Sequence, residues 1–177
     1  MMITPTGYSV KYFLIACFIF LATGCATCKY STRDTSPIPP DVKTFRVQYL
    51  ENHANYVNPQ LSPQITEKLK QKIIGQTRLR QTNGDDAHYD ISGFVTDYSV
   101  TTTGITNQNA STNRLNVSFH LVFKNTLEPN KDPIQSDITR SYDFDAQLSL
   151  PQAEAKLFAD IVRNLVDEIF NKIFVNW

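Results

Sequence analysis

Charge of one sign, glycine clusters and cysteine pairs are all scarce in this sequence. Its 17 basic residues balance its 17 acidic residues, so it lacks the basic excess of a nucleic-acid-binding protein. Its six glycines form no cluster that would cradle a phosphate. Its three cysteines do not combine with histidines at a zinc-binding spacing. These absences argue against nucleic-acid, nucleotide and zinc-dependent functions.

Patterns for catalysis are missing as well. His53, His88 and His120 lie far apart in the sequence, and the serines follow no nucleophile-elbow pattern. Asp85 and Asp86 are typical of a turn rather than of a carboxylate pair for acid–base chemistry. We therefore expect a protein that is not an enzyme and that holds no metal or organic cofactor.

The most apolar stretch lies near the start of the chain, where Lys11 precedes the uncharged residues 12–22. A basic residue, a short apolar stretch and then small residues form the layout of a secretory signal. A helix over residues 12–22 would be about 16 Å long, too short for a hydrocarbon core of about 30 Å. We therefore expect an export signal over residues 1–24 and no permanent transmembrane helix.

A cysteine follows the small residues of this signal. Residues 21–25 (LATGC) resemble the lipobox of bacterial lipoproteins, in which the cysteine carries a diacylglycerol and the signal is cleaved just before it. We expect Cys25 to be acylated, with Cys28 as the alternative acceptor. The acyl chains would attach the protein to a membrane, because each buried methylene contributes about 0.8 kcal/mol. The remaining alternative is an ordinary secretory cleavage beside an incidental cysteine.

The composition changes after the signal. Residues 25–37 are polar and end at Pro37, and Pro39 and Pro40 follow, so we expect a tether between the lipid and a folded domain. Residues 38–177 are long enough for one domain with a sizeable core. The eleven phenylalanines and eight tyrosines of the chain favour a folded domain over a disordered one.

Alternating apolar and polar residues predict the strands. The expected strands cover residues 42–50, 79–82, 88–103, 115–123 and 138–145. In the first of them, Phe45, Val47 and Tyr49 share the inward face. Within 88–103 the alternation changes phase, which predicts a β-bulge between Gly93 and Asp97. The polar residues that precede and follow the strand 115–123 are expected to be hairpin loops over 104–114 and 125–137.

Apolar residues at helical spacing predict two helices. The first has Ser62 as its expected N-cap and ends near Thr77. The second follows Ser149 and Gln152, which have the spacing of a capping box, and ends near Val175. Its apolar side chains form two adjacent rows, Leu157–Ile161–Leu165–Ile169–Ile173 and Phe158–Val162–Val166–Phe170–Phe174.

Together these elements predict an α/β fold of the α+β type. We expect a two-layer sandwich with two amphipathic helices packed on one face of a mostly antiparallel four-stranded sheet. The other face carries threonine, asparagine, serine, arginine and histidine. That face can therefore be solvated or can meet a polar partner surface.

Several short segments of the mature chain carry a family resemblance. They are 38–45 (IPPDVKTF), 57–59 (VNP), 61–62 (LS), 66–70 (TEKLK), 76–79 (QTRL), 113–115 (NRL), 142–144 (YDF) and 169–177 (IFNKIFVNW). Together they resemble the LptE family of lipopolysaccharide-assembly lipoproteins, and their order and spacing over nearly all of the mature chain make the set specific. One departure is the extra Cys25-Ala26-Thr27 before Cys28, which leaves both cysteines open as the acylated residue.

This resemblance implies a two-helix, four-strand sandwich that sits inside the large outer-membrane β-barrel LptD. There the family acts as plug and assembly partner and binds lipopolysaccharide. The protein would be lipid-anchored at the outer membrane and would face the periplasm. The alternative is an envelope lipoprotein of similar fold that scaffolds or activates a periplasmic enzyme.

The family's lipopolysaccharide contacts do not transfer to this sequence by motif. Four basic residues in or beside the expected hairpin loops are the candidates, because together they would bind a phosphate if they converge. If they do not converge, they are ordinary solvated loop charges, which is the interpretation that the sequence favours. These residues are Arg114, Lys124, Lys131 and Arg140.

Overall fold

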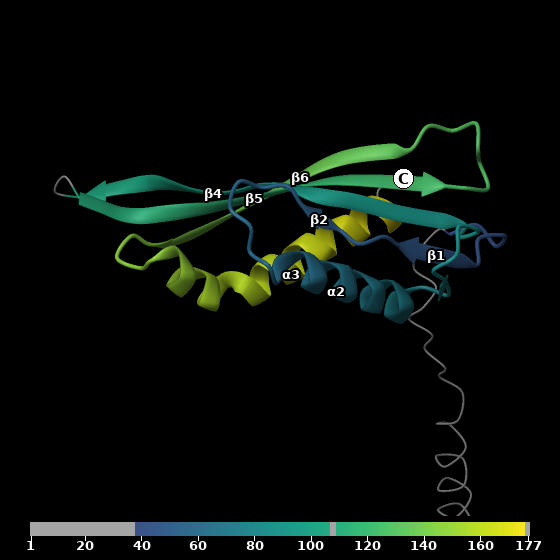
Figure 1. Ribbon diagram of the computed structural model, residues 1–177, viewed down its shortest axis with the longest axis horizontal. Helices are drawn as coiled ribbons and strands as arrows, with labels where there is room; N and C mark the ends of the chain where they lie inside the picture. Colours follow the sequence, from purple (N-terminus) through teal and green to yellow (C-terminus); the bar gives the residue numbers. More distant parts are fainter. Residues whose placement is uncertain (1–37, 107–108, 176–177) are drawn as a thin grey trace, which may run out of the picture. The chain divides into compact units, whose positions relative to one another are not determined.

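The computed structural model describes residues 38–106 and 109–175. In this part of the chain, two helices lie along one face of a six-stranded sheet (Figure 1). The elements in chain order are β1 (Thr44–Val47), β2 (Glu51–Asn52), α2 (Leu61–Gln76), β3 (Arg80–Gln81), β4 (Tyr89–Thr106), β5 (Asn109–Asn125), β6 (Ile134–Asp145) and α3 (Leu150–Phe174).

The sheet is mixed. Its strand order is β3-β1-β4-β5-β6, and β2 pairs with β4 beyond the end of β1. The pairs β4–β5 and β5–β6 are antiparallel hairpins, whereas β1 runs parallel to both β3 and β4. The parallel pairs arise because α2 returns the chain to the same end of the sheet before β3 and β4 begin. The α+β class and the two-layer arrangement are therefore confirmed.

The expectation of a mostly antiparallel four-stranded sheet is wrong in strand number, since the described residues form six strands. Two of the strands are short, since β2 and β3 contain two residues each. β3 lies within the short strand expected over 79–82, whereas β2 was not expected, because a two-residue strand is too short to show a period of two. Such strands form because the longer neighbour β1 or β4 already presents a row of backbone donors and acceptors.

The core lies between the sheet and the helices. The inward residues of β5 are all buried, as the alternation predicts, and α2 covers part of the sheet with a row of buried side chains. One inward assignment is wrong: Tyr49 is 62% exposed and Leu50 is buried instead. The alternation fails there because β1 ends at Val47. The buried rows are Leu115, Val117, Phe119, Leu121 and Phe123 on β5 and Leu61, Ile65, Leu69 and Ile73 on α2.

The predicted bulge in β4 is confirmed. The pairing of β4 with β5 shifts register between Val95 and Asp97. The inserted residue lets both Val95 and Tyr98 point into the core, because an extra residue reverses the phase of a strand. This bulge is what allows one long strand to keep an apolar face over most of its length.

The two hairpin loops are shorter than expected. Residues 104–106 and 109–114 continue as strand, since β4 reaches Thr106 and β5 begins at Asn109, and β6 begins at Ile134 instead of at 138. A hairpin can extend through polar residues because its ladder uses backbone groups, and the paired strands beneath already hold the two chains together. The polarity of the sequence alone therefore overestimates the length of these loops.

The helix ends agree in part with the sequence. For α3, Ser149 is the N-cap and its N–H donates to Gln152 Oε1 at 2.9 Å, as the capping-box spacing predicts. For α2, the expected cap is wrong: the helix begins at Leu61, and the Ser62 hydroxyl is buried within it without a hydrogen-bond partner. The helix starts earlier because Asn58 Oδ1 accepts from the N–H of Gln60, which turns the chain before Ser62.

Two glycines of this fold are predicted to respond oppositely to alanine. No atom lies within 4 Å of a Cβ built on Gly75, so Gly75→Ala should stabilise α2 by about 0.5–1 kcal/mol. A Cβ on Gly93 would lie 2.6 Å from Phe119 Cζ and would also overlap the His120 carbonyl oxygen, so Gly93→Ala should destabilise by about 1–3 kcal/mol. Urea unfolding of both variants measures this, and equal effects would contradict the packing described for β4.

Candidate functional site

Paired polar side chains cover the face of the sheet that points away from the helices. Arg46 of β1 binds Asp90 of β4 through Nε and Oδ1 at 2.9 Å, and His120 Nδ1 lies 2.6 Å from Asp137 Oδ1. Ser118 and Thr139 join through their hydroxyls at 3.0 Å. These contacts link neighbouring strands side by side, so the expectation of a polar outer face is confirmed.

The four basic candidate residues do not converge. Arg114 on the outer face binds Asp143 through Nε and Oδ1 at 2.6 Å, and this hydrogen bond lowers the pKa of Asp143. Lys124 lies ten residues farther along β5, about 33 Å away at the rise of a strand. Lys131 pairs with Glu128 in the loop after β5, and Arg140 pairs with Glu168 of α3. They therefore form no joint phosphate site, and their contact with lipopolysaccharide stays a prediction.

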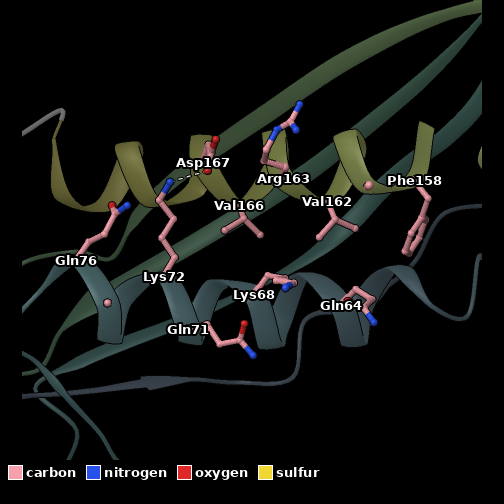
Figure 2. Close-up of a pocket in the computed structure, with 12 residues that line it drawn as sticks. Gln64, Lys68, Gln71, Lys72, Gln76, Phe158, Val162, Arg163, Val166 and Asp167 are labelled. Carbon is pink, nitrogen blue, oxygen red and sulfur yellow. Dashed lines mark hydrogen bonds and ion pairs between the residues drawn. The ribbon is translucent and has the colours of Figure 1, made fainter. Parts of the chain in front are cut away.

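A groove runs between α2 and α3, with a volume of about 820 Å³ (Figure 2). Its floor is one row of α3, Phe158, Val162 and Val166, and its α2 side carries amides and lysines, among them Gln64 and Lys68. Its size falls in the range of about 300–1,000 Å³ that ligand pockets occupy. The groove is therefore the clearest candidate site among the described residues.

The groove exists because the two helices present unlike faces to one another. The apolar row of α2 turns toward the sheet, so polar residues of its next row, among them Gln64 and Lys68, border the groove. Long polar side chains keep their charged ends in water instead of filling an apolar space. Lys72 bridges the helices by binding Asp167 at 2.6 Å, with its ammonium 5.1 Å from the centre of the Phe170 ring.

A buried carboxylate lies beside one end of the groove. Glu154 of α3 is only 8% exposed and accepts three hydrogen bonds from neutral donors. Tyr98 Oη donates at 2.7 Å and Asn58 Nδ2 at 2.9 Å to its Oε1, and Tyr56 Oη donates at 3.1 Å to its Oε2. These bonds tie the β2–α2 connection and β4 to the first turns of α3. The cluster also lines a second hollow of about 430 Å³, which shares Phe158 with the groove.

The tyrosines of this cluster are held in the neutral form. Burial raises the pKa of Tyr98 well above its usual range, and its hydrogen bond to Glu154 raises it further. The same two causes, burial first, raise the pKa of Tyr56. A neutral phenol is the donor that the carboxylate requires, so the cluster stays intact throughout the neutral pH range.

Other expectations concern metals and the chain's first segment. The described residues contain no group of three metal-binding side chains and no helix with the length and apolarity to cross a membrane. Cys25 and Cys28 lie outside the described residues. The sequence alone did not indicate the groove or the Glu154 cluster, because each joins residues almost a hundred positions apart.

Comparison with known proteins gives one family and several similar folds. The family model LptE, described as lipopolysaccharide-assembly, matches residues 42–173. Among curated proteins, none matches the chain.

Solved structures show the fold. Hypothetical protein CT253 from Chlamydia trachomatis is 10% identical, with a TM-score of 0.53 over 74% of this chain and 95% of that one. Protein XCC0632 from Xanthomonas campestris is 9% identical, with a TM-score of 0.50 over 76% and 89%. Rare lipoprotein B from Shewanella oneidensis is 14% identical, with a TM-score of 0.49 over 72% and 92%. At these identities, the first two likenesses show a shared fold alone.

The Glu154 cluster predicts a stability loss at alkaline pH. The folded state keeps the Tyr98 proton above pH 10, where the unfolded chain releases it, so stability is complete below about pH 10 and falls as the pH rises further. Tyr98→Phe should cost about 1–3 kcal/mol at neutral pH, because Glu154 loses a donor, and should flatten this alkaline slope. Denaturant unfolding between pH 8 and 11 measures both effects. An unchanged slope in Tyr98→Phe would contradict them.

Proposed function

We propose that this chain, which belongs to the LptE lipopolysaccharide-assembly family, is the outer-membrane lipoprotein subunit of a lipopolysaccharide translocon. The family match over residues 42–173 carries the proposal, since it extends over nearly the whole described domain. Its partner would be a large β-barrel of the LptD type, which the protein plugs and helps to assemble. Lipopolysaccharide would bind to this complex on its way to the outer leaflet.

Features of the sequence and fold support this partnership. The outer face of the sheet is polar, and ion pairs such as Arg46–Asp90 and Arg114–Asp143 neutralise charges on it, so it suits a polar barrel lumen. On the hairpin of β4 and β5 this face carries Thr101 and Asn116, and Asn116 Nδ2 donates to Thr101 Oγ1 at 3.3 Å. A surface of this kind suits a wet protein interface better than a lipid-facing one.

We further propose the arrangement of the first residues. Residues 1–24 are a signal peptide, residues 25–37 are a lipidated tether, and the sandwich domain begins at residue 38. Cys25 is the acylated residue in this proposal, with Cys28 as the alternative. The tether would hold the domain near the outer membrane on its periplasmic side. As in the rest of this non-enzymatic family, the protein would act by binding and not by catalysis.

The partnership predicts what co-purifies with the protein. A tagged, lipidated chain solubilised from envelope membranes in mild detergent should bring down a large β-barrel in stoichiometric amount, together with lipopolysaccharide. Mass spectrometry identifies the protein, and lipid analysis identifies the lipopolysaccharide. A soluble enzyme in place of the barrel, or no barrel at all, would contradict the proposal and favour a scaffold or activator role.

The anchor predicts a difference between two cysteine variants. Cys25→Ser should release the protein from the membrane fraction, whereas Cys28→Ser should leave it there, because the acyl chains supply the attachment. Fractionation and intact mass of the mature protein read this out. If only Cys28→Ser released the protein from the membrane fraction, Cys28 would be the acylated residue. If neither variant released it, the result would contradict the lipid anchor.

A further inference from the structure

The hollow beside Glu154 and the groove follow one another along α3, the hollow against residues 151–158 and the groove against residues 158–167. Both are lined by Phe158, which stands where they meet, at one end of the groove in Figure 2. We call this surface the α3 trough and define it by Glu154, Phe158, Val162 and Val166 of α3 with Lys68 of α2 across from them. From Glu154 to Val166 it is about 18 Å long, at the rise of an α-helix.

We propose that the α3 trough is a docking site for an amphipathic segment of a protein partner, which places a basic side chain beside Glu154 and an acidic side chain beside Lys68. The site lies on the helix layer, away from the polar sheet face to which the barrel partnership was assigned. It therefore goes beyond the proposed function and does not depend on it.

The Glu154 end calls for a cation. All three donors to this buried carboxylate are neutral, and no lysine, arginine or histidine of the described chain forms an ion pair with it. Its Oε2 accepts one hydrogen bond, from Tyr56, and so keeps a free acceptor position beside the second hollow. A charged donor makes a hydrogen bond about twice as strong as a neutral one. The partly exposed ring of Tyr56 offers the same cation an aromatic face.

The other end calls for an anion. Lys68 is exposed on the rim, and within the described chain it is not joined to a carboxylate, whereas Lys72 pairs with Asp167 and Arg163 pairs with Asp160. Figure 2 places Lys68 across the groove from Val162, between the amide side chains Gln64 and Gln71. An acidic side chain would complete this set of donors.

Between the two charges lies an apolar strip. Phe158 and Val162 form a floor one side chain wide, and Gly75 leaves the α2 side open farther along. Glu154 and Val162 are about 12 Å apart along α3. A bound helix would therefore carry its basic and acidic residues about eight positions apart, and an extended segment about four positions apart.

This spacing favours a polypeptide over a lipid. A lipid head group carries its charges next to one another, so a lipid that satisfied Lys68 would leave hydrocarbon against the carboxylate of Glu154. Burying a carboxylate against hydrocarbon is costly. A protein segment can present opposite charges at the required separation with apolar side chains between them.

Photocrosslinking in cells tests the proposal on the full-length, lipidated protein. A photoreactive residue replaces Ala155 near Glu154 or Gln71 near Lys68, and the matched control replaces Thr139 on the sheet face. Both trough positions should crosslink to one segment of one protein, with a basic residue near the first adduct and an acidic residue near the second. Adducts with lipid only, no adducts, or protein adducts without this charge pattern would each overturn it.

A charge reversal sharpens this test. Lys68→Glu should lower the yield of the Ala155 adduct at least tenfold, whereas Lys70→Glu should leave it unchanged, because Lys70 lies on the same helix outside the trough. Lys68 is exposed, so the fold tolerates the change, and thermal unfolding confirms this. Equal effects of the two variants, or no effect of either, would contradict the docking site. Barrel co-purification, measured on the same variants, reports separately on the proposed function.

Discussion

The rest of the structure depends on one constraint, which is that both rows of apolar side chains on α3 must be buried away from water. The row that begins with Leu157 packs against the inward face of the sheet, where β5 supplies five buried side chains in strict alternation. In the row that begins with Phe158, the first three side chains line the groove, with α2 as their neighbour across it. The apolar row of α2 packs against the sheet, so the side chains of α2 that lie opposite Phe158, Val162 and Val166 are polar. Because these polar side chains do not fill the space between the helices, a groove remains there.

Local patterns predicted most of the fold, because each was decided by residues close in sequence. The long alternation of β5, the phase change that demands a bulge before Asp97 and the Ser149–Gln152 capping box all appear as expected. The failures have a common cause in pairing between distant segments. The two-residue strand β2 exists only because β4 offers it a sheet edge, and residues 104–106 and 109–114 pair despite their polarity.

The candidate site was harder to predict than the fold, since its parts meet only in three dimensions. Tyr56, Tyr98 and Glu154 lie on three separate elements, and nothing in their local sequence marks them as partners. The basic residues chosen for their place in loops turned out to be distributed along the sheet and its edge, as Arg114 and Arg140 illustrate. The functional assignment to lipopolysaccharide assembly rests on the family match over residues 42–173 and not on the candidate site.

The most direct test of that assignment is the amount of lipopolysaccharide at the cell surface after the protein is depleted from its own bacterium. We predict that the amount of lipopolysaccharide at the cell surface falls, while newly made lipopolysaccharide accumulates in the envelope without reaching the outer leaflet. Re-expression of the full-length chain should restore the surface level. Unchanged surface lipopolysaccharide in depleted cells, with depletion verified by immunoblot, would contradict the account.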